Sequence, residues 1–347
     1  MDTNELLDEL KKFNEHELFY KDYYNAKQGE NFQEYLGNLD KEYIKEQFLI
    51  VPEIEGGFMP DSIGDDAFFF DDNDKNNVIL SKHNRYTPVF SHQHQFFELA
   101  YVLQGFCEQT TGHNHFKLNE GDLCLISPYT KHSIGVFDDS LVINILIRGS
   151  TFEDIFYTTL KDKNKLSSFF NNSLYTKNYN AHLIISSGKD SFIKNHILSM
   201  FIENMEKKKY YENILNSGLM ILLSKLLQNY EDTIQLPVET QKSSAAFSDI
   251  MAYIDENYQT VSLSDIADKF HFSTAYCSRL IKKHTGKSFT QLQQAIRFRQ
   301  ACFFLENTNK SIAEISELIG FNNVEHFNRL FKKIYASTPG QYRKEKN

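Results

Sequence analysis

Apolar residues near the C-terminal end of the chain recur at helical spacing, and the pattern occurs twice. A first helix is predicted from apolar positions at i, i+3, i+4 and i+7, which are Leu263, Ile266, Ala267 and Phe270. About fifty residues later the corresponding positions are Ile312, Ile315 and Ile319. The second helix of each copy has its own stripe, which is Cys277, Leu280, Ile281 and His284 in one copy and Phe327, Leu330, Phe331 and Ile334 in the other. The pattern predicts two helix-turn-helix units, at about 263–284 and 312–334.

Both second helices carry a repeated basic segment, Arg-Leu-Ile-Lys-Lys at 279–283 and Arg-Leu-Phe-Lys-Lys at 329–333. Helical geometry puts one set of positions opposite each apolar stripe, and these are the residues we expect to contact DNA: Ala275, Ser278, Arg279, Lys282, Lys283, Glu325, His326, Asn328, Arg329, Lys332 and Lys333. Arginine can donate two hydrogen bonds to guanine and glutamate can accept one from cytosine. The four lysines are expected to contact phosphates. The alternative is that these residues form ordinary solvent-exposed helix faces. Two copies with matching positions argue against it.

Local signals mark where the helices of both units begin and turn. Ser262 with Asp265, and Ser311 with Glu314, form capping-box patterns. Gly320 can adopt the positive φ that a tight turn between helices requires. Between the units, a long helix is predicted from Phe289 to about Leu305, which would fix the spacing of the two units.

The rest of the chain changes character several times, which predicts a multidomain α+β protein. Residues 1–64 form an N-terminal extension, in which a helix is expected from Asp2 to Tyr24. Residues 65–150 contain short apolar runs separated by turn residues, which predicts an all-β barrel or sandwich with strands at 78–80, 97–103, 123–126 and 141–147. Residues 151–232 are expected to be helical, residues 233–246 have linker composition, and residues 247–346 form an all-α domain.

The second helix predicted within residues 151–232 is apolar on more than one face, through Ile214, residues 220–223, Leu226 and Leu227. A helical hairpin alone does not need this much apolar surface. We therefore expect the hairpin to pack on the barrel and also on a second copy of the chain. Ordinary packing within one chain is the alternative.

Histidines in the predicted barrel form a second group of candidate residues. His92, His94 and Glu98 share the parity of one strand face, and His132 on a later strand can complete a set of three histidines and one glutamate. Such a set suits Fe, Mn, Ni or Zn. The alternative is that these side chains form hydrogen bonds within the barrel or line an effector pocket. His113 and His115 have similar spacing but fall at a predicted hairpin turn, so we expect them at the surface.

Charge is divided unevenly along the chain, whose formal net charge is −9. Residues 244–347 hold 14 Lys and Arg against 10 Asp and Glu, a net charge of +4, and the remainder has a net charge of −13. The positive surplus therefore lies with the helix-turn-helix units. The four cysteines show no zinc-site spacing and are expected to be buried free thiols. We expect neither a signal peptide nor a membrane-spanning segment.

A resemblance to a known family rests on the residues of the C-terminal part. The stretch from Ser311 to Lys333, followed by Thr338-Pro-Gly-Gln-Tyr-Arg343, resembles the signature of the AraC/XylS family of bacterial transcription regulators. This resemblance implies that both second helices enter successive major grooves of promoter DNA, one helical turn or roughly 34 Å apart. His326 stands where the family often has tyrosine, a change expected to alter base preference and not the fold.

The barrel segment is similar to both cupin motifs. The first motif fits closely, but Val136 stands where the second usually has asparagine, and the gap from Gly121 to Pro128 is one residue longer than usual. Sensor barrels of AraC-type regulators commonly keep such residues while binding a small organic effector, so no cofactor is required and a metal ion is an alternative.

The resemblance as a whole implies a cytoplasmic, homodimeric transcription regulator, more often an activator than a repressor, that binds an effector in the barrel and acts with RNA polymerase. No membrane partner and no enzymatic activity are expected. A metal-dependent oxygenase or isomerase with an added DNA-binding domain, and a regulator without a ligand, are the competing hypotheses.

Overall fold

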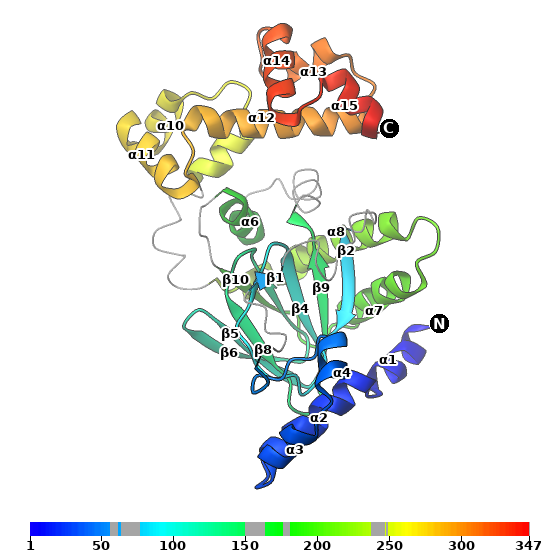
Figure 1. Ribbon diagram of the computed structural model, residues 1–347. Helices are drawn as coiled ribbons and strands as arrows, with labels where there is room; N and C mark the ends of the chain where they lie inside the picture. Colours follow the sequence, from blue (N-terminus) through cyan, green and yellow to red (C-terminus); the bar gives the residue numbers. More distant parts are fainter. Residues whose placement is uncertain are drawn as a thin grey trace. The chain divides into compact units, whose positions relative to one another are not determined.

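The computed structural model in Figure 1 describes residues 1–55, 62–63, 77–149, 164–175, 181–236, 247 and 249–346. The chain divides into two compact units. The first comprises Met1–Ser167 and Asn178–Val238, and the second comprises Ser168–Lys177 and Glu239–Asn347. The division falls within helix α6 (Lys165–Tyr175). Among the described residues, no helix is long and apolar enough to cross a membrane.

The chain begins with four short helices, α1 (Thr3–Lys11), α2 (Glu15–Lys27), α3 (Phe32–Asn38) and α4 (Lys41–Glu46). The prediction of one helix from Asp2 to Tyr24 was wrong, because the helix is interrupted between α1 and α2. Asp2 and Asn14 each form a capping box, with Glu5 and Glu17. A capping residue has extended backbone angles, so a second cap at Asn14 ends the first helix and starts another.

Two β-sheets enclose the core of the first unit. The larger sheet has the strand order β10-β7-β4-β9-β2, and the smaller has the order β6-β5-β8. The bounds of the strands of the larger sheet are β2 Val78–Lys82, β4 Phe97–Gln104, β7 Asp122–Ile126, β9 Leu141–Ile147 and β10 His182–Ser186. Those of the smaller sheet are β5 Phe106–Thr111, β6 Asn114–Asn119 and β8 His132–Gly135. The strands predicted from the apolar runs at 78–80, 97–103, 123–126 and 141–147 are confirmed.

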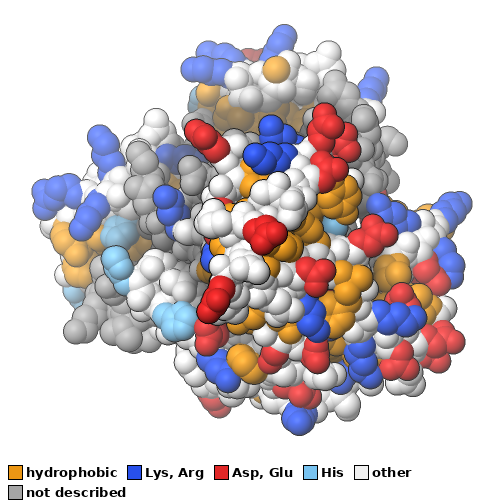
Figure 2. All heavy atoms as spheres, turned by 60° about the horizontal axis from the view of Figure 1, so that its bottom comes forward, with side chains coloured by type: hydrophobic (Ala, Val, Ile, Leu, Met, Phe, Trp, Pro, Cys, Tyr) orange, Lys and Arg blue, Asp and Glu red, His pale blue; other side chains and the backbone are white. Residues whose placement is uncertain are grey.

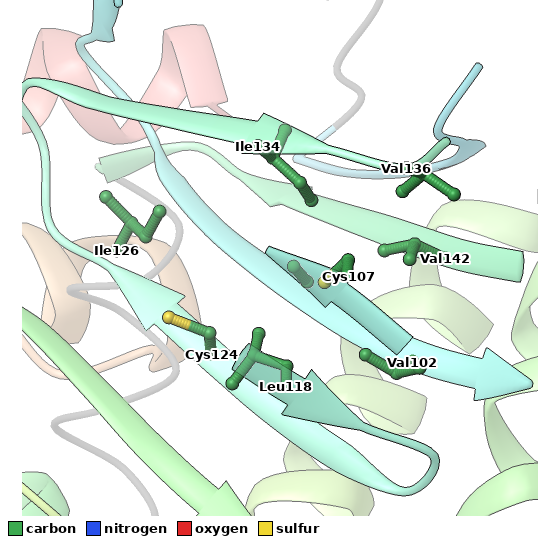
Figure 3. Close-up of a cluster of buried hydrophobic side chains, with 9 residues drawn as sticks. Val102, Cys107, Leu118, Cys124, Ile126, Ile134, Val136 and Val142 are labelled. Atoms are coloured by element: carbon green, nitrogen blue, oxygen red, sulfur yellow. The ribbon is translucent and has the colours of Figure 1, made fainter. Parts of the chain in front are cut away.

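The apolar cluster between the sheets is shown in Figure 3. The larger sheet contributes Val102, Cys124, Ile126 and Val142, and these side chains meet Cys107, Leu118 and Ile134 from the smaller sheet. Alternate residues of β4 enter this cluster, as expected for strand periodicity. All four cysteines are free, as predicted; Cys107, Cys124 and Cys277 are buried, while Cys302 is only partly buried.

The segment expected to be helical after residue 150 also contains a strand, which corrects that prediction. β10 pairs antiparallel with β7 and extends the larger sheet. The alternating burial of residues 183–186 fits a strand at this position. The helices α7 (Ser191–Glu206) and α8 (Tyr211–Tyr230) follow as the expected hairpin, pack on each other, and both contact β2. Residues 150–163 and most of the predicted linker lie outside the described residues.

The second unit is helical throughout its described part. Its named helices after residue 260 are α10 (Leu263–Phe270), α11 (Thr274–Thr285), α12 (Phe289–Asn307), α13 (Ile312–Leu318), α14 (Val324–Tyr335) and α15 (Pro339–Lys346). The first helix-turn-helix unit is α10 and α11, and the second is α13 and α14. Of the predicted stripe residues, Ile334 is 53% exposed, and the others are buried except for six that are half-buried: Leu263, Phe270, Leu280, His284, Ile312 and Leu330. Tyr335, one position later, packs on Phe331 instead.

Candidate functional site

The second helices of the two helix-turn-helix units, α11 and α14, start in the same way. Ser273 caps α11 by accepting a hydrogen bond from the backbone N–H of Tyr276, and Asn323 caps α14 by accepting one from His326. Each helix then buries its apolar stripe, and α14 packs with Phe298, Phe321 and other apolar residues of the second unit. The opposite face of each helix is therefore presented to solvent.

The structure places the predicted contact residues on these exposed faces, with two differences. Those that are exposed are Ala275, Arg279, Lys282, Lys283, Glu325, His326, Arg329, Lys332 and Lys333. Ser278 and Asn328 are half-buried, and the buried side-chain oxygen of Asn328 has no hydrogen-bond partner among the residues that the structure describes. Within the described residues, neither arginine nor any of the four lysines forms an ion pair. These six positive charges are thus available to an external anion.

Two aromatic residues near the start of α11 were missed by the sequence prediction. Tyr276 is 40% exposed and Phe272 is 37% exposed, and their rings lie 4.8 Å apart. Phe272 belongs to the turn and Tyr276 to the first turn of the helix, where a reading helix approaches base edges. Aromatic residues are usually assigned to the core, so the apolar pattern gave no reason to select them.

Acidic and basic side chains are mixed on the face of the molecule shown in Figure 2.

Within the C-terminal domain, helix α12 lies between the two helix-turn-helix units (Figure 1). Its 19 residues give it a length of about 28 Å, comparable with one turn of B-form DNA. The predicted helix from Phe289 to about Leu305 is therefore confirmed, with its end at Asn307.

A loop before α10 connects both helix-turn-helix units. The carbonyl of Gln259 accepts a hydrogen bond from Arg297 of α12 at 2.7 Å, and the Gln259 side chain donates to the carbonyl of Leu318 at 2.8 Å. Gly320 has a φ of +83°, and a Cβ at this position would lie 2.3 Å from the Gln259 carbonyl oxygen. The predicted positive φ in this turn is confirmed, and the glycine also lets the two backbones approach closely.

The segment Thr338–Arg343 closes the second unit. The Tyr342 hydroxyl donates to Glu306 at 2.7 Å, and its ring meets Phe331 edge-on. Arg343 donates hydrogen bonds to the carbonyls of Leu305 and Lys310. These contacts satisfy carbonyls near the end of α12, so this part of the family signature serves to hold helices together.

The barrel histidines and glutamate predicted from the sequence lie close together. The expectation that one strand carries His92, His94 and Glu98 was wrong, because His94 ends β3 (Gln93–His94) and Glu98 belongs to β4. Even so, Glu98 Oε2 lies 2.9 Å from His94 Nε2 and 3.4 Å from His132 Nε2. One ligand atom from each of His92, Glu98 and His132 lies within 4.8 Å of the others. His113 and His115 are exposed, as predicted; His113 lies in the β5–β6 turn and His115 near the start of β6.

Burial and neighbouring groups shift the pKa values of His92, His94 and Glu98. All four side chains are at most 9% exposed. Loss of hydration lowers the pKa of His92 to about 4 and also lowers the pKa of His94. Burial alone would raise the pKa of Glu98, but the adjacent His132 and His94 hold it well below its ordinary value. Glu98 is therefore ionised at neutral pH.

A cavity of about 370 Å³ opens beside the cluster. His92, His94 and Glu98 line it, together with apolar residues of the sheets such as Ile134 and Leu146. The cavity size falls in the range of small-molecule sites. His132 does not line this cavity, although it contacts Glu98.

The N-terminal extension forms part of the cavity wall, which the sequence did not reveal. His16 and Tyr20 of α2 line the cavity, as does the segment 47–50. The Tyr20 hydroxyl accepts a hydrogen bond from the backbone N–H of Ile50 at 2.9 Å and so joins these two parts of the wall. A role for the extension in the pocket could not be predicted, because it depends on a contact between segments far apart in the chain.

A buried ion network attaches the extension to the barrel. Glu17 is fully buried and accepts hydrogen bonds from Lys82 at 2.6 Å and from Arg85 Nε at 2.8 Å. The same two cations donate to backbone carbonyls at the end of α1, including that of Lys12. The guanidinium of Arg85 also stacks 3.7 Å above the ring of Phe13.

Comparison with known proteins assigns both units. The family described as AraC-like ligand binding domain matches residues 80–168, and the family described as helix-turn-helix domain matches residues 266–345. The transposon Tn10 TetD protein of Escherichia coli is 33% identical over 121 residues, which are 34% of this chain and 88% of that protein. The uncharacterized HTH-type transcriptional regulator YfiF of Bacillus subtilis is 27% identical over 268 residues, covering 75% of this chain and 80% of that protein.

The chain is also similar to a further relative and to two solved structures. The HTH-type transcriptional activator RhaS of Yersinia pestis is 24% identical over 260 residues, covering 73% of this chain and 89% of that protein. The C-terminal domain of the response regulator yesN of Fusobacterium nucleatum is 35% identical, with a TM-score of 0.27, and covers 28% of this chain and 97% of that structure. ToxT of Vibrio cholerae is 14% identical over 78% of this chain and 98% of that structure, with a TM-score of 0.33. On the sequence matches, the chain belongs to the AraC family of DNA-binding transcription regulators and carries a family ligand-binding domain.

Proposed function

We propose that this protein is a homodimeric transcription activator that binds promoter DNA through α11 and α14 in response to a small organic effector in the barrel cavity. The observation that carries the DNA part is the pair of exposed basic faces on two helices separated by α12. The domains would then be an N-terminal extension and barrel for the effector, α7 and α8 for dimerisation, and residues 247–346 for DNA. A DNA target supports a cytoplasmic location.

The two reading helices have different exposed residues, which supports recognition of two different half-sites. Near its start α11 presents Ala275 and Tyr276, whereas α14 presents Glu325 and His326. We assign base contacts to Arg279 and Arg329 and phosphate contacts to the four lysines, since the lysines lie later in each helix. The N-termini of both helices, capped by Ser273 and Asn323, would point towards the groove.

The cavity supports the effector part. Aromatic and aliphatic side chains line it together with many polar ones, which could orient a small molecule. Because its wall combines α2 and residues 47–50 with the sheets, an effector bound there contacts the extension and the barrel at once. Such an effector can shift the position of the extension only if it binds one arrangement more tightly than another.

The exposed face of α8 supports the dimer. Ile214 is 45% exposed and Ile221 is 47% exposed, and both line a groove with Met200 and Gly218. Ile214, Gly218 and Ile221 belong to α8, follow helical spacing and lie on one face of this helix. Apolar residues gathered on one exposed helical face are typical of a protein interface. Activation, which would involve contact with RNA polymerase, is supported by the name of the RhaS relative as a transcriptional activator.

DNA binding is tested by fluorescence anisotropy with the duplex upstream of the protein's own gene. We expect binding that weakens steeply with salt and is at least about a thousandfold tighter than to unrelated duplexes. Equal affinity for all duplexes would contradict a sequence-specific regulator. A transcription assay with purified RNA polymerase then separates activation, an increase in transcript, from repression.

A further inference from the structure

The three histidines of the barrel cluster share an arrangement of their Nδ1 atoms. Each lies near the backbone carbonyl oxygen of a residue two positions away: His94 Nδ1 is 2.7 Å from Phe96 O, His132 Nδ1 is 2.9 Å from Thr130 O, and His92 Nδ1 is 3.4 Å from Phe90 O. A carbonyl oxygen can only accept a hydrogen bond, so the ring hydrogen belongs on Nδ1. In a neutral imidazole, Nε2 then has a lone pair and no hydrogen.

The Nε2 atoms of His94 and His132 face the same oxygen of Glu98, at 2.9 and 3.4 Å. A carboxylate oxygen also has only lone pairs. Two of the histidines therefore present acceptors to an acceptor, and both are buried, with His94 1% and His132 2% exposed. The Nε2 of His132 has no hydrogen-bond partner within the described residues. The lone pairs of His94, His132 and Glu98 face one another, so the arrangement needs a positively charged species at its centre.

Extra protons are a poor candidate for that species. One proton on His94 would satisfy its contact with Glu98 but would leave Nε2 of His132 without a hydrogen facing the same oxygen, and a proton on each ring would place two positive charges next to a single carboxylate. Burial does not favour such charges, since His94 is only 1% and His132 only 2% exposed. A single divalent cation accepts lone pairs from all the rings and from the carboxylate at once.

We propose that His92, His94, Glu98 and His132 bind one divalent transition-metal ion at the edge of the cavity. Three imidazole nitrogens and one carboxylate oxygen are a donor set that zinc, iron, cobalt and nickel accept. The contacts of the Nδ1 atoms with carbonyls are the interactions that orient histidine ligands around a metal. Ligand atoms of His92, Glu98 and His132 already lie within 4.8 Å of one another, and His94 is in contact with Glu98.

The position of the site suggests how an effector binds, and this step rests on the proposed effector role of the cavity. His92, His94 and Glu98 line the cavity, so the coordination positions left by the protein face it. A ligand with a carboxylate or another anionic oxygen donor can occupy these positions, while its apolar part contacts residues such as Phe48 and Ile50. The effector class would be a small amphipathic anion that binds metal.

The test uses the full-length chain without a polyhistidine tag, stripped by a chelator and titrated with Co²⁺, whose visible absorption reports its ligands. We expect one Co²⁺ per chain, displaced by Zn²⁺, and a higher thermal unfolding midpoint for the metal-bound protein. Glu98→Gln is expected to lose the Co²⁺ spectrum and yet remain folded, because an amide N–H can donate to the lone pair of His94.

The control is the double variant His113→Ala with His115→Ala, which removes an exposed pair of similar spacing and is expected to bind Co²⁺ as the wild type does. Absence of stoichiometric binding to the wild type, or undiminished binding to Glu98→Gln, would overturn the proposal. DNA binding is measured on the same samples. If Glu98→Gln loses metal binding but keeps DNA binding, the regulator assignment stands. If the wild type binds metal but shows no specific DNA binding, the regulator assignment is refuted and the metal site is not.

Discussion

Removing the charge of Glu17 tests whether the N-terminal extension is held to the barrel by its buried ion network. Glu17→Gln keeps the shape of the side chain but leaves Lys82 and Arg85 without their carboxylate. Breaking a buried ion pair from one side typically costs about 3–5 kcal/mol. Arg85 retains hydrogen bonds to the carbonyls of Lys11 and Lys12, so we expect the lower end, about 3 kcal/mol.

Hydrogen exchange followed by mass spectrometry measures this loss where it occurs, because the two units of the chain need not unfold together. A cost of about 3 kcal/mol corresponds to a roughly hundredfold fall in the protection of the amides in α2. Asp22→Asn is the matched control, since Asp22 lies on the exposed side of the same helix and its change is expected to alter stability by less than about 0.5 kcal/mol. Equal protection in both variants would refute the role of the network.

The effect of Glu17 also depends on pH in a defined direction. Burial alone would raise the pKa of Glu17, but the hydrogen bonds from Arg85 and Lys82 outweigh it and hold the pKa below its ordinary value. A carboxyl with a lowered folded pKa contributes full stability above its unfolded pKa of about 4.3 and loses it as the pH falls through the folded value. The difference between wild type and Glu17→Gln should therefore be constant near neutral pH and shrink in acid. A difference that grows on acidification would contradict this assignment.

Three further changes address the DNA-binding domain and the dimer. Gly320→Ala should destabilise the second unit by at least about 1–2 kcal/mol in thermal unfolding, because the alanine is strained at positive φ and its Cβ approaches Gln259. Gly340→Ala is the control and should be neutral, because a Cβ at this position meets nothing within 4 Å. Arg329→Ala should cost about 1–3 kcal/mol of affinity and relax preference at one base pair, while Lys333→Ala should weaken binding to all duplexes and lower the salt slope by about one; identical behaviour of the two variants in anisotropy would refute the division of contacts. Ile214→Asp should give a monomer in analytical ultracentrifugation without loss of helicity, and an unchanged dimer would exclude this face.

The C-terminal unit could be predicted closely from the sequence because its signals are local. Capping boxes at Ser262 and Ser311, the glycine at 320 and the two apolar stripes each depend on residues a few positions apart. The exception was Ile334, where the stripe continued in the sequence but Tyr335 turned towards the core instead. Helical periodicity does not decide which of two adjacent apolar residues fills the last position.

The first unit could be predicted only in part, because its organisation depends on contacts distant in sequence. The strands followed from short apolar runs, but the pairing of β10 with β7 joins residues about sixty positions apart. The cavity wall formed by α2 depends on the contact between Glu17 and Arg85, 68 positions apart. Acidic residues in a polar segment usually predict a solvated surface, so nothing in the sequence distinguished Glu17 from its neighbours.

The most direct test of the regulator assignment is selection of bound duplexes from a random library by the full-length protein. We expect two short enriched blocks whose centres lie about 10 base pairs apart, one helical turn. Arg279→Ala should then lose the information in one block and Arg329→Ala that in the other. A single block, no enrichment, or loss of the same block in both variants would contradict the claim that α11 and α14 read successive major grooves.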